Sequence, residues 1–418
     1  MTTRAQIKDK EWDIHNYNHS IDLILKSAKR DLPKRNYELL CDYDKSMVRT
    51  ALSKATRTKH LQTILTESKM INKEWKDVLR ADVDELVFKI METYADSKGQ
   101  ESYSSYDMKK ILRIFFRWMK TGNRKKKANE IDPYEVQGIE LKTVKDKIVR
   151  EDLLDDDGDD LEKLLKACGD NARDRAFIDV HAEAGTRPGE TLSLRIKDVK
   201  TDDNGAVINV IGKTYARPVR LIRSVPNLLA YLQNHPYRTT PDAPLWIMID
   251  PDDYGKPMTY VSARAMVLRR VKNAKMTKKI YLNLFRHSEA TKLANFMTEA
   301  QLRKRHGWTA TSKMPARYVH MVNSDVENAI FEHYGIKKKE ETKPDAPVKC
   351  QFCDMFNPHD SEICSKCTKP LNLEVAIKQD EETQKQKETL ESKLDSIQED
   401  NAKIMAWIAR QEKSKKKK

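Results

Sequence analysis

The chain has 418 residues, and its 78 lysines and arginines outnumber 64 aspartates and glutamates, which gives a formal charge of +14. A single hydrophobic core seldom grows past about 250 residues, so this length disfavours a one-domain protein and predicts two or three domains. The positive charge favours a polyanionic partner, either nucleic acid or an anionic membrane surface. No window approaches the run of about 18 apolar residues that a membrane span requires, and MTTRAQIKDKEWD has no apolar signal-peptide core, so we expect a soluble, cytoplasmic protein.

The first 122 residues are predicted to form a helical domain. From about residue 15 to 121, apolar residues recur at spacings of three and four, and glycine and proline are nearly absent. The clearest helix is 104–120, where Ser104 or Ser105 can cap the start and Gly122 follows the end. Its apolar stripe consists of Met108, Ile111, Leu112, Phe115, Trp118 and Met119.

A basic, helix-breaking stretch, NRKKKANEIDP at 123–133, is typical of a linker between domains. The second domain, 134–336, combines helical patterns with two β-rich runs, VINVI at 207–211 and RPVRLI at 217–222. The intervening GKTYA indicates a hairpin. The predicted fold is therefore mainly α with a small antiparallel β-sheet, so that the second domain is of the α+β type.

The segment EAGTRPGETLSLRIKDV, residues 183–199, suggests a site for an anion. Thr186 can cap a helix whose first turn contains Pro188, and this places Arg187 at the helix N-terminus. Backbone amides and a guanidinium can hold one phosphate together at such a position. Glu190 lies one turn further on and could support the Arg187 side chain.

Three other segments supply side chains of complementary chemistry. Lys213 lies at the tip of the hairpin, from which a flexible ammonium can donate a proton to a leaving oxygen. NLFRHSEATKLANF carries Arg286 and, as a supporting residue, His287, while HGWTATSKMPARYVHM carries Trp308 and Tyr318. Each residue alone could be a surface ion-pair partner, a turn lysine or a packed aromatic. Their order and spacing favour a shared catalytic site.

Four motifs carry a resemblance to a known family. They are GTRPGETLSL, a GK pair before a β-strand, FRHSEAT, and a GW pair whose tryptophan is followed ten residues later by the tyrosine of RYVH. In this order they resemble the boxes of the tyrosine recombinases, the phage integrases and Xer-type recombinases, especially their archaeal members. The helical N-terminal region is similar to the core-binding, SAM-like DNA-binding domain of this family.

The resemblance assigns roles to the site residues. It implies that Arg187 and Arg286 stabilise charge on a scissile phosphate during in-line attack. Lys213 would protonate the leaving 5′ oxygen, and Tyr318 would form a 3′-phosphotyrosyl link. Trp308 takes a position that holds His or Trp in the family, where its indole N–H can donate to phosphate. Because the covalent bond stores the energy of the cut, no ATP and no catalytic cofactor are expected.

One position departs from the family pattern. Where the family has H-x-x-R, this chain has Asn283-Leu-Phe-Arg286. Asparagine can donate a hydrogen bond to phosphate, but it cannot take a proton from Tyr318 near neutral pH. We therefore predict slowed but not abolished cleavage. His306, two residues before Trp308, is a weaker candidate for the role of Trp308.

The resemblance also implies the partners and the domain organisation. Residues 1–122 would bind duplex DNA, 123–133 would link the domains, and 134–336 would form the catalytic domain of a nucleoid-associated homo-tetramer. No membrane partner is expected. One alternative is a type IB topoisomerase-like enzyme that relaxes DNA without a partner duplex. Another is a DNA-binding repressor or architectural protein without catalysis, for which Asn283 is the support.

The C-terminal region contains two CxxC pairs separated by ten residues, Cys350 and Cys353 followed by Cys364 and Cys367. Four thiolates at this spacing predict a zinc ribbon over 345–372 with a structural Zn²⁺ and no open catalytic position. An iron centre or free thiols are the alternatives. Zinc ribbons bind either nucleic acid or protein, so an accessory protein is a further possible partner.

A heptad pattern follows the ribbon within residues 376–411. Its seam consists of Leu390, Leu394, Ile397, Asn401, Ile404 and Ile408. This pattern predicts either a short coiled coil, with Asn401 favouring one register, or a single amphipathic helix that packs on a neighbour or an accessory protein. Residues 412–418, EKSKKKK, are predicted to form a disordered basic tail attracted to DNA.

Overall fold

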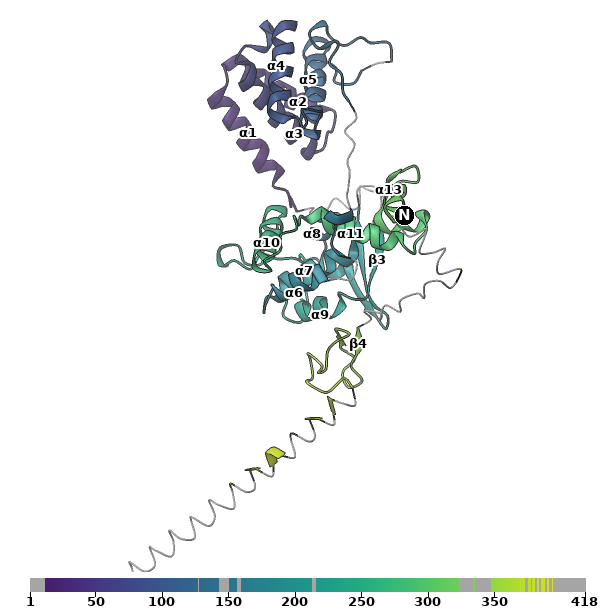
Figure 1. Cartoon of the computed structure of the whole chain (residues 1–418). Coiled ribbons are helices and arrows are strands. Elements are labelled where there is room, and N and C mark those ends of the chain that lie inside the picture. The colour runs from purple at the N-terminus through teal and green to yellow at the C-terminus, as the bar shows by residue number, and fades with distance from the viewer. Residues whose placement is uncertain are drawn as a thin grey trace, which may run out of the picture. The chain divides into compact units, whose positions relative to one another are not determined.

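The computed structural model (Figure 1) describes most of the chain in two compact units. The first comprises Met1–Asp152 and Met258–Ala263, and the second comprises Leu153–Pro257 and Arg264–Lys418. No helix among the described residues is long and apolar enough to cross a membrane. The described residues are 12–126, 128–142, 150–155, 159–212, 216–322, 334 and 347–372, with single residues of the tail up to 393.

The first unit is a helical domain. Its elements are α1 (Tyr17–Asp31), α2 (Lys34–Arg49), α3 (Lys54–Ile71), α4 (Arg80–Tyr94) and α5 (Tyr103–Thr121), with short 3₁₀ helices at Trp75–Asp77, Tyr134–Val136 and Arg150–Asp152. The helix predicted at 104–120 corresponds to α5. The Ser102 hydroxyl accepts a hydrogen bond from the Ser105 N–H at 3.1 Å, so Ser102 is the N-cap instead of Ser104 or Ser105. Gly122 ends the helix in the left-handed conformation.

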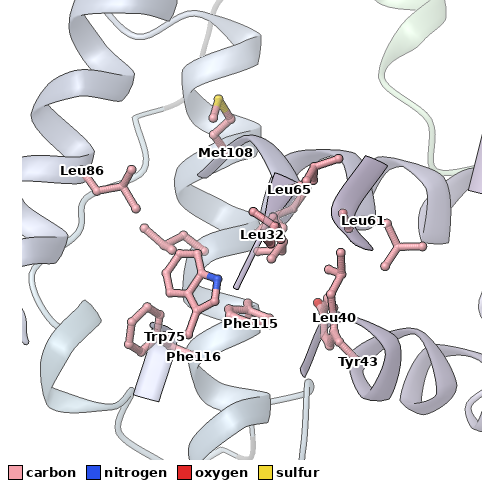
Figure 2. Packing of buried hydrophobic residues seen from close by; sticks show 14 of the residues in the cluster. Leu32, Leu40, Tyr43, Leu61, Leu65, Trp75, Leu86, Met108, Phe115 and Phe116 are labelled. Atoms are coloured by element: carbon pink, nitrogen blue, oxygen red, sulfur yellow. The ribbon is translucent and has the colours of Figure 1, made fainter. Parts of the chain in front are cut away.

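Aliphatic and aromatic side chains together fill the core of the first unit (Figure 2). Trp75, Phe115 and Phe116 are at most 1% exposed and pack edge-to-face, a geometry that aromatic quadrupoles favour. The Trp75 indole N–H donates to the Ser68 hydroxyl at 2.7 Å, so the buried polar group has a partner. This unit therefore has a well-packed core of its own.

The second unit combines helices with two small antiparallel sheets, and the predicted fold class is confirmed. α7 is its central helix, with Phe177, Ile178 and Val180 fully buried, and packs against α9, α11 and β3. The helices are α6 (Asp159–Lys166), α7 (Ala172–Ala184), α8 (Pro188–Leu192), α9 (Val225–Gln233), α11 (Leu282–Ala294), α12 (Glu299–His306), α13 (Met314–Val322) and, shared with the first unit, α10 (Tyr260–Asn273), with 3₁₀ turns at Ile196–Asp198 and Pro251–Asp253. The strands are β1 (Val199–Asp202), β2 (Gly205–Ile211), β3 (Ala216–Leu221), β4 (Val348–Lys349) and β5 (Phe356–Asn357).

The larger sheet has the order β1-β2-β3. The two predicted runs correspond to β2 and β3, whose register pairs Ile208 with Val219 and Val210 with Arg217. β1 was not predicted, because its sequence VKTD lacks an alternation of apolar and polar residues and its side chains are largely exposed. The hairpin residue Lys213 lies outside the described part of the chain.

Candidate active site

Arg187 lies immediately before α8, with Pro188 in the first turn. Its side chain is 42% exposed and donates to Glu190 Oε1 at 2.8 Å, while its backbone N–H donates to Glu190 Oε2 at 3.0 Å. Glu190 therefore holds the guanidinium at the helix N-terminus, where the helix dipole also favours an anion. Thr186 does not cap α8 as expected. Its hydroxyl lies 2.5 Å from the hydroxyl of Thr191.

Gly185 permits the close approach of the segments around this arginine. It ends α7 with φ of 57°, a left-handed conformation that glycine adopts without strain. A Cβ atom at this position would lie 2.9 Å from side-chain atoms of both Glu289 and His306. The Gly185 carbonyl accepts hydrogen bonds from Arg286 at 2.9 Å and from His306 Nδ1 at 3.2 Å. Substitution here would push the two arginine segments apart.

Arg286 is a buried cation on α11, with 6% of its surface exposed. Its guanidinium donates to the carbonyls of Gly185 and His306, at 2.9 and 2.8 Å, and lies 5.3 Å from the centre of the Trp308 ring. Burial, and then the charge of Arg187, lower the pKa of Arg286 to about 10. No carboxylate among the described residues lies within 4 Å of this guanidinium. The site thus carries positive charge for which an anionic ligand would compensate.

Tyr318, on α13, is only 1% exposed. Its ring stacks on Trp308, with centroids 5.5 Å apart and planes at 10°. The hydroxyl lies 2.8 Å from Nδ1 of His287, the residue after Arg286 on α11. His287 and Tyr318 are 31 positions apart in the sequence. The packing of α13 on α11 (Figure 1) brings them together.

His306 contributes to packing beneath the site. It is fully buried and stacks on Trp308 with centroids 4.8 Å apart. Burial, with the charge of Arg286, lowers the pKa of His306 well below its usual range, so the ring is neutral at physiological pH. Because its Nδ1 faces the Gly185 carbonyl, that nitrogen carries the proton and donates the hydrogen bond.

Asn283 is exposed on α11, one turn before Arg286 and His287. Within the described residues its side chain makes no hydrogen bond. The structure therefore brings together most of the predicted site residues and leaves Asn283 at the surface. Those in mutual contact are Arg187 with Glu190, and Arg286, His287, Trp308 and Tyr318.

Arg217, on β3, is a buried arginine of the site that was not predicted from the sequence. It is 4% exposed, donates to Glu190 Oε2 at 2.9 Å and, through Nε, to the Arg305 carbonyl at 2.8 Å. Burial raises the pKa of Glu190, but the hydrogen bond and charge of Arg217, with those of Arg187, outweigh it and lower the pKa overall. Arg217 occupies an inward-facing position of an alternating strand, and a charged residue at such a position is a signal that the sequence contains.

Residues 157–324 match the model of the phage integrase family. The chain carries a phage integrase domain. The match extends from the acidic start of α6 past the end of α13, and it includes Arg187, Arg286 and Tyr318. The predicted resemblance to this family is thereby confirmed, whereas the resemblance to archaeal members in particular stays a prediction.

The integrase domain is similar to a curated transposase and to DNA-bound integrases. Transposase A from transposon Tn554 of Staphylococcus aureus is 27% identical over 195 residues, which cover 44% of this chain and 53% of that protein. The chain thus spans about half the length of the curated relatives it matches. A lambda integrase dimer bound to a COC′ core site has a TM-score of 0.52 and 13% identity over 68% of this chain and 76% of that chain. The Tn1549 transposon integrase in complex with transposon right end DNA has a TM-score of 0.50 and 16% identity, over 71% of this chain and 99% of that chain. These structures show a shared fold.

His181 forms hydrogen bonds to both the segment that carries Arg187 and the segment that carries Arg286. It is fully buried on α7, its Nε2 donates to the Leu282 carbonyl at 2.9 Å, and its Nδ1 lies 2.8 Å from the Thr191 hydroxyl. Because Nε2 faces a carbonyl, Nδ1 is the acceptor. Leu282 begins α11, which carries Arg286, and Thr191 belongs to α8, which follows Arg187.

The burial of His181 should make the free energy of unfolding depend on pH. Burial lowers the pKa of His181 from 6.5 to about 4, so the stabilisation is complete above pH 6.5 and is lost as the pH falls towards 4. Between pH 7 and pH 5 we expect the wild-type protein to lose about 2 kcal/mol of unfolding free energy relative to His181→Gln, which does not titrate. Urea unfolding of both proteins at the two pH values measures this difference. A constant difference between them would contradict the assignment.

The four C-terminal cysteines form one cluster. All four sulfur atoms lie within 4.8 Å of one another, and the Sγ atoms of Cys350 and Cys367, like those of Cys353 and Cys364, are 3.6 Å apart. Four sulfurs around a tetrahedral ion at bond lengths of about 2.3 Å are separated by about 3.8 Å, so the donor set fits a metal such as zinc.

The heptad seam predicted within residues 376–411 lies outside the described residues except for Leu390.

Proposed function

We propose that this chain is a site-specific tyrosine recombinase that cuts and rejoins duplex DNA through a 3′-phosphotyrosyl intermediate at Tyr318. One observation carries the proposal: the Tyr318 ring stacks on Trp308, and the same indole lies against the buried guanidinium of Arg286, a cation that donates to two backbone carbonyls and whose pKa the charge of Arg187 lowers further. A phosphodiester between the two arginines would neutralise this charge. It would also place phosphorus near the nucleophile.

The residues of the site support each part of an in-line displacement. Arg187 and Arg286 would stabilise the negative charge of the pentacoordinate transition state, and Trp308 would donate its indole N–H to a phosphate oxygen. Lys213, on the β2–β3 hairpin, would protonate the leaving 5′ oxygen. Asn283 is exposed one turn before Arg286, where it could donate to phosphate but not accept a proton. The energy of the cleaved phosphodiester bond is conserved in the new phosphotyrosyl ester, so neither ATP nor a catalytic cofactor is needed.

The remaining parts of the chain fit DNA as the substrate. We propose that residues 1–122 form the core-binding DNA-binding domain, that 123–133 is the linker and that 134–336 is the catalytic domain. Exchange of strands between two duplexes requires four cuts, which favours a homo-tetramer on DNA. Such an enzyme acts at the nucleoid. The formal charge of +14 provides the sequence-independent attraction to the DNA backbone.

Trapping of a covalent complex tests this function. Nicked duplexes prepared from the DNA that flanks the coding sequence lose a short 5′-hydroxyl strand after cleavage, so the enzyme stays attached. We expect wild-type protein to form a denaturant-resistant adduct. Tyr318→Phe should bind the same duplexes with unchanged affinity and form none. Binding without an adduct by the wild-type protein would favour a DNA-binding regulator, and relaxation of any supercoiled plasmid by the monomer would favour a topoisomerase-like enzyme.

We further propose that Cys350, Cys353, Cys364 and Cys367 hold a structural Zn²⁺. When bound, the ion would cross-link the two CxxC turns and supply no reaction chemistry. We expect one zinc per chain by elemental analysis, and loss of that zinc in Cys364→Ser together with faster proteolysis between residues 345 and 372. Cys168→Ser, which removes a buried cysteine elsewhere, should keep the metal. Iron in place of zinc, or equal protease resistance after chelation, would contradict the proposal.

A further inference from the structure

The contact between His287 and Tyr318 places a base at the nucleophile. Nδ1 of His287 lies 2.8 Å from the Tyr318 hydroxyl, and the two rings face each other with centroids 6.1 Å apart at 29°. His287 is only partly buried, whereas Tyr318 is 1% exposed. Both side chains belong to packed helices, α11 and α13, which hold them at this distance. The distance is within the range over which a general base removes a proton.

The other described residues of the site are unsuited to this role. Arg286 and the Trp308 indole are donors only, and the amide of Asn283 does not take a proton near neutral pH. His306 stacks on Trp308 and donates from Nδ1 to the Gly185 carbonyl, and its neutral ring has a strongly lowered pKa. A base with such a lowered pKa is a poor proton acceptor.

We infer that His287 is a catalytic residue that accepts the proton of Tyr318 during cleavage. The neutral ring would carry its proton on Nε2, so that Nδ1 accepts the hydrogen bond of the Tyr318 hydroxyl. The Tyr318 oxygen bonds to phosphorus, the bond from phosphorus to the 5′ oxygen breaks, and the tyrosine proton passes to Nδ1. The leaving 5′ oxygen takes a proton from the general acid, Lys213 in the proposed function. During rejoining, His287 returns its proton to the phenolate of Tyr318.

This role rests on the proposed function and changes the expectation for Asn283. Asn283 replaces the family histidine, and from the sequence this replacement predicts slow cleavage. With His287 one turn further along α11, the chain has a proton acceptor on the same helix. Cleavage should therefore be limited more by loss of His287 than by the presence of Asn283.

A substrate with sulfur in place of the bridging 5′ oxygen separates base from acid. A thiolate is a far better leaving group than an alkoxide and needs no proton, because a thiol has a pKa of about 8.5. In single-turnover cleavage we expect His287→Gln to be slowed about 100-fold on both the ordinary and the sulfur substrate. Lys213→Ala should be slow only on the ordinary substrate. Glutamine retains a hydrogen bond to Tyr318 but cannot take its proton.

A second measurement guards against a folding defect. His287→Ala should regain cleavage in proportion to added imidazole, while Tyr318→Phe should gain nothing. Cleavage by His287→Gln within threefold of wild type would overturn the inference, as would recovery of His287→Gln on the sulfur substrate, which would make His287 the acid. A wild-type protein that forms no adduct on either substrate would instead refute the proposed function.

Discussion

Replacement of Arg286 by methionine is expected to slow single-turnover cleavage about 1,000-fold or more while the protein stays folded. The guanidinium is buried among carbonyls and an aromatic ring, so an anion docked there would gain charge-assisted hydrogen bonds in a dry environment. Loss of one such donor alone costs about 100- to 1,000-fold in other enzymes. Methionine retains the aliphatic stem and removes a buried charge that no carboxylate of the described residues neutralises, which offsets part of the cost of the two lost hydrogen bonds to carbonyls.

Two variants control this measurement. Arg286→Lys keeps a charge but loses the planar fork, and we expect it to remain strongly impaired. Arg238→Ala removes an exposed arginine beyond the end of α9 and should cleave at the wild-type rate. Cleavage by Arg286→Met within tenfold of wild type, with an unchanged melting temperature, would show that Arg286 does not bind the scissile phosphate.

Replacement of Arg217 by methionine should affect both stability and cleavage. Arg217 and Glu190 form a buried ion pair at 2.9 Å, and removal of one partner of such a pair costs about 3 to 5 kcal/mol. Glu190 would keep its hydrogen bonds to Arg187, so the lower end of this range applies. We expect the free energy of unfolding to fall by about 3 kcal/mol. Cleavage should fall at least tenfold at a temperature at which the variant is folded, because Glu190 also orients Arg187.

A double-mutant cycle separates these two effects. Arg217→Met combined with Glu190→Gln should regain part of the stability, because no buried carboxylate remains without its Arg217 partner, but it should not regain cleavage. Arg220→Ala, which removes an exposed arginine of the same strand paired with Asp202, should change stability by less than about 0.5 kcal/mol. Equal effects of the Arg217 and Arg220 substitutions would contradict the positioning role.

The fold was predictable where a single periodicity dominates. α5 has a continuous apolar stripe, and β2 and β3 alternate around a short turn, so residue spacing alone located them. β1 and the caps of α5 and α8 were missed, because they depend on backbone hydrogen bonds and on competing side chains. Three serines lie near the start of α5, and only the structure shows that Ser102 accepts the capping hydrogen bond.

Site residues that belong to sequence motifs were predictable, whereas residues whose role depends on tertiary contacts were harder to predict. Arg187, Arg286 and Tyr318 were located by motif order. His287 was recognised only as a supporting residue, because its contact with Tyr318 depends on how α13 packs against α11. Arg217 had a sequence signal, a charge at an inward strand position, but its partner Glu190 lies 27 residues away. The position of Lys213 remains a prediction, since it falls outside the described residues.

Identification of the residue joined to DNA tests the central claim most directly. The covalent complex trapped on a nicked duplex would be digested with protease and nuclease, and the linked peptide sequenced by mass spectrometry. The account predicts a nucleotide attached through its 3′-phosphate to the oxygen of Tyr318. Attachment at another residue, or through a 5′-phosphate, would contradict it.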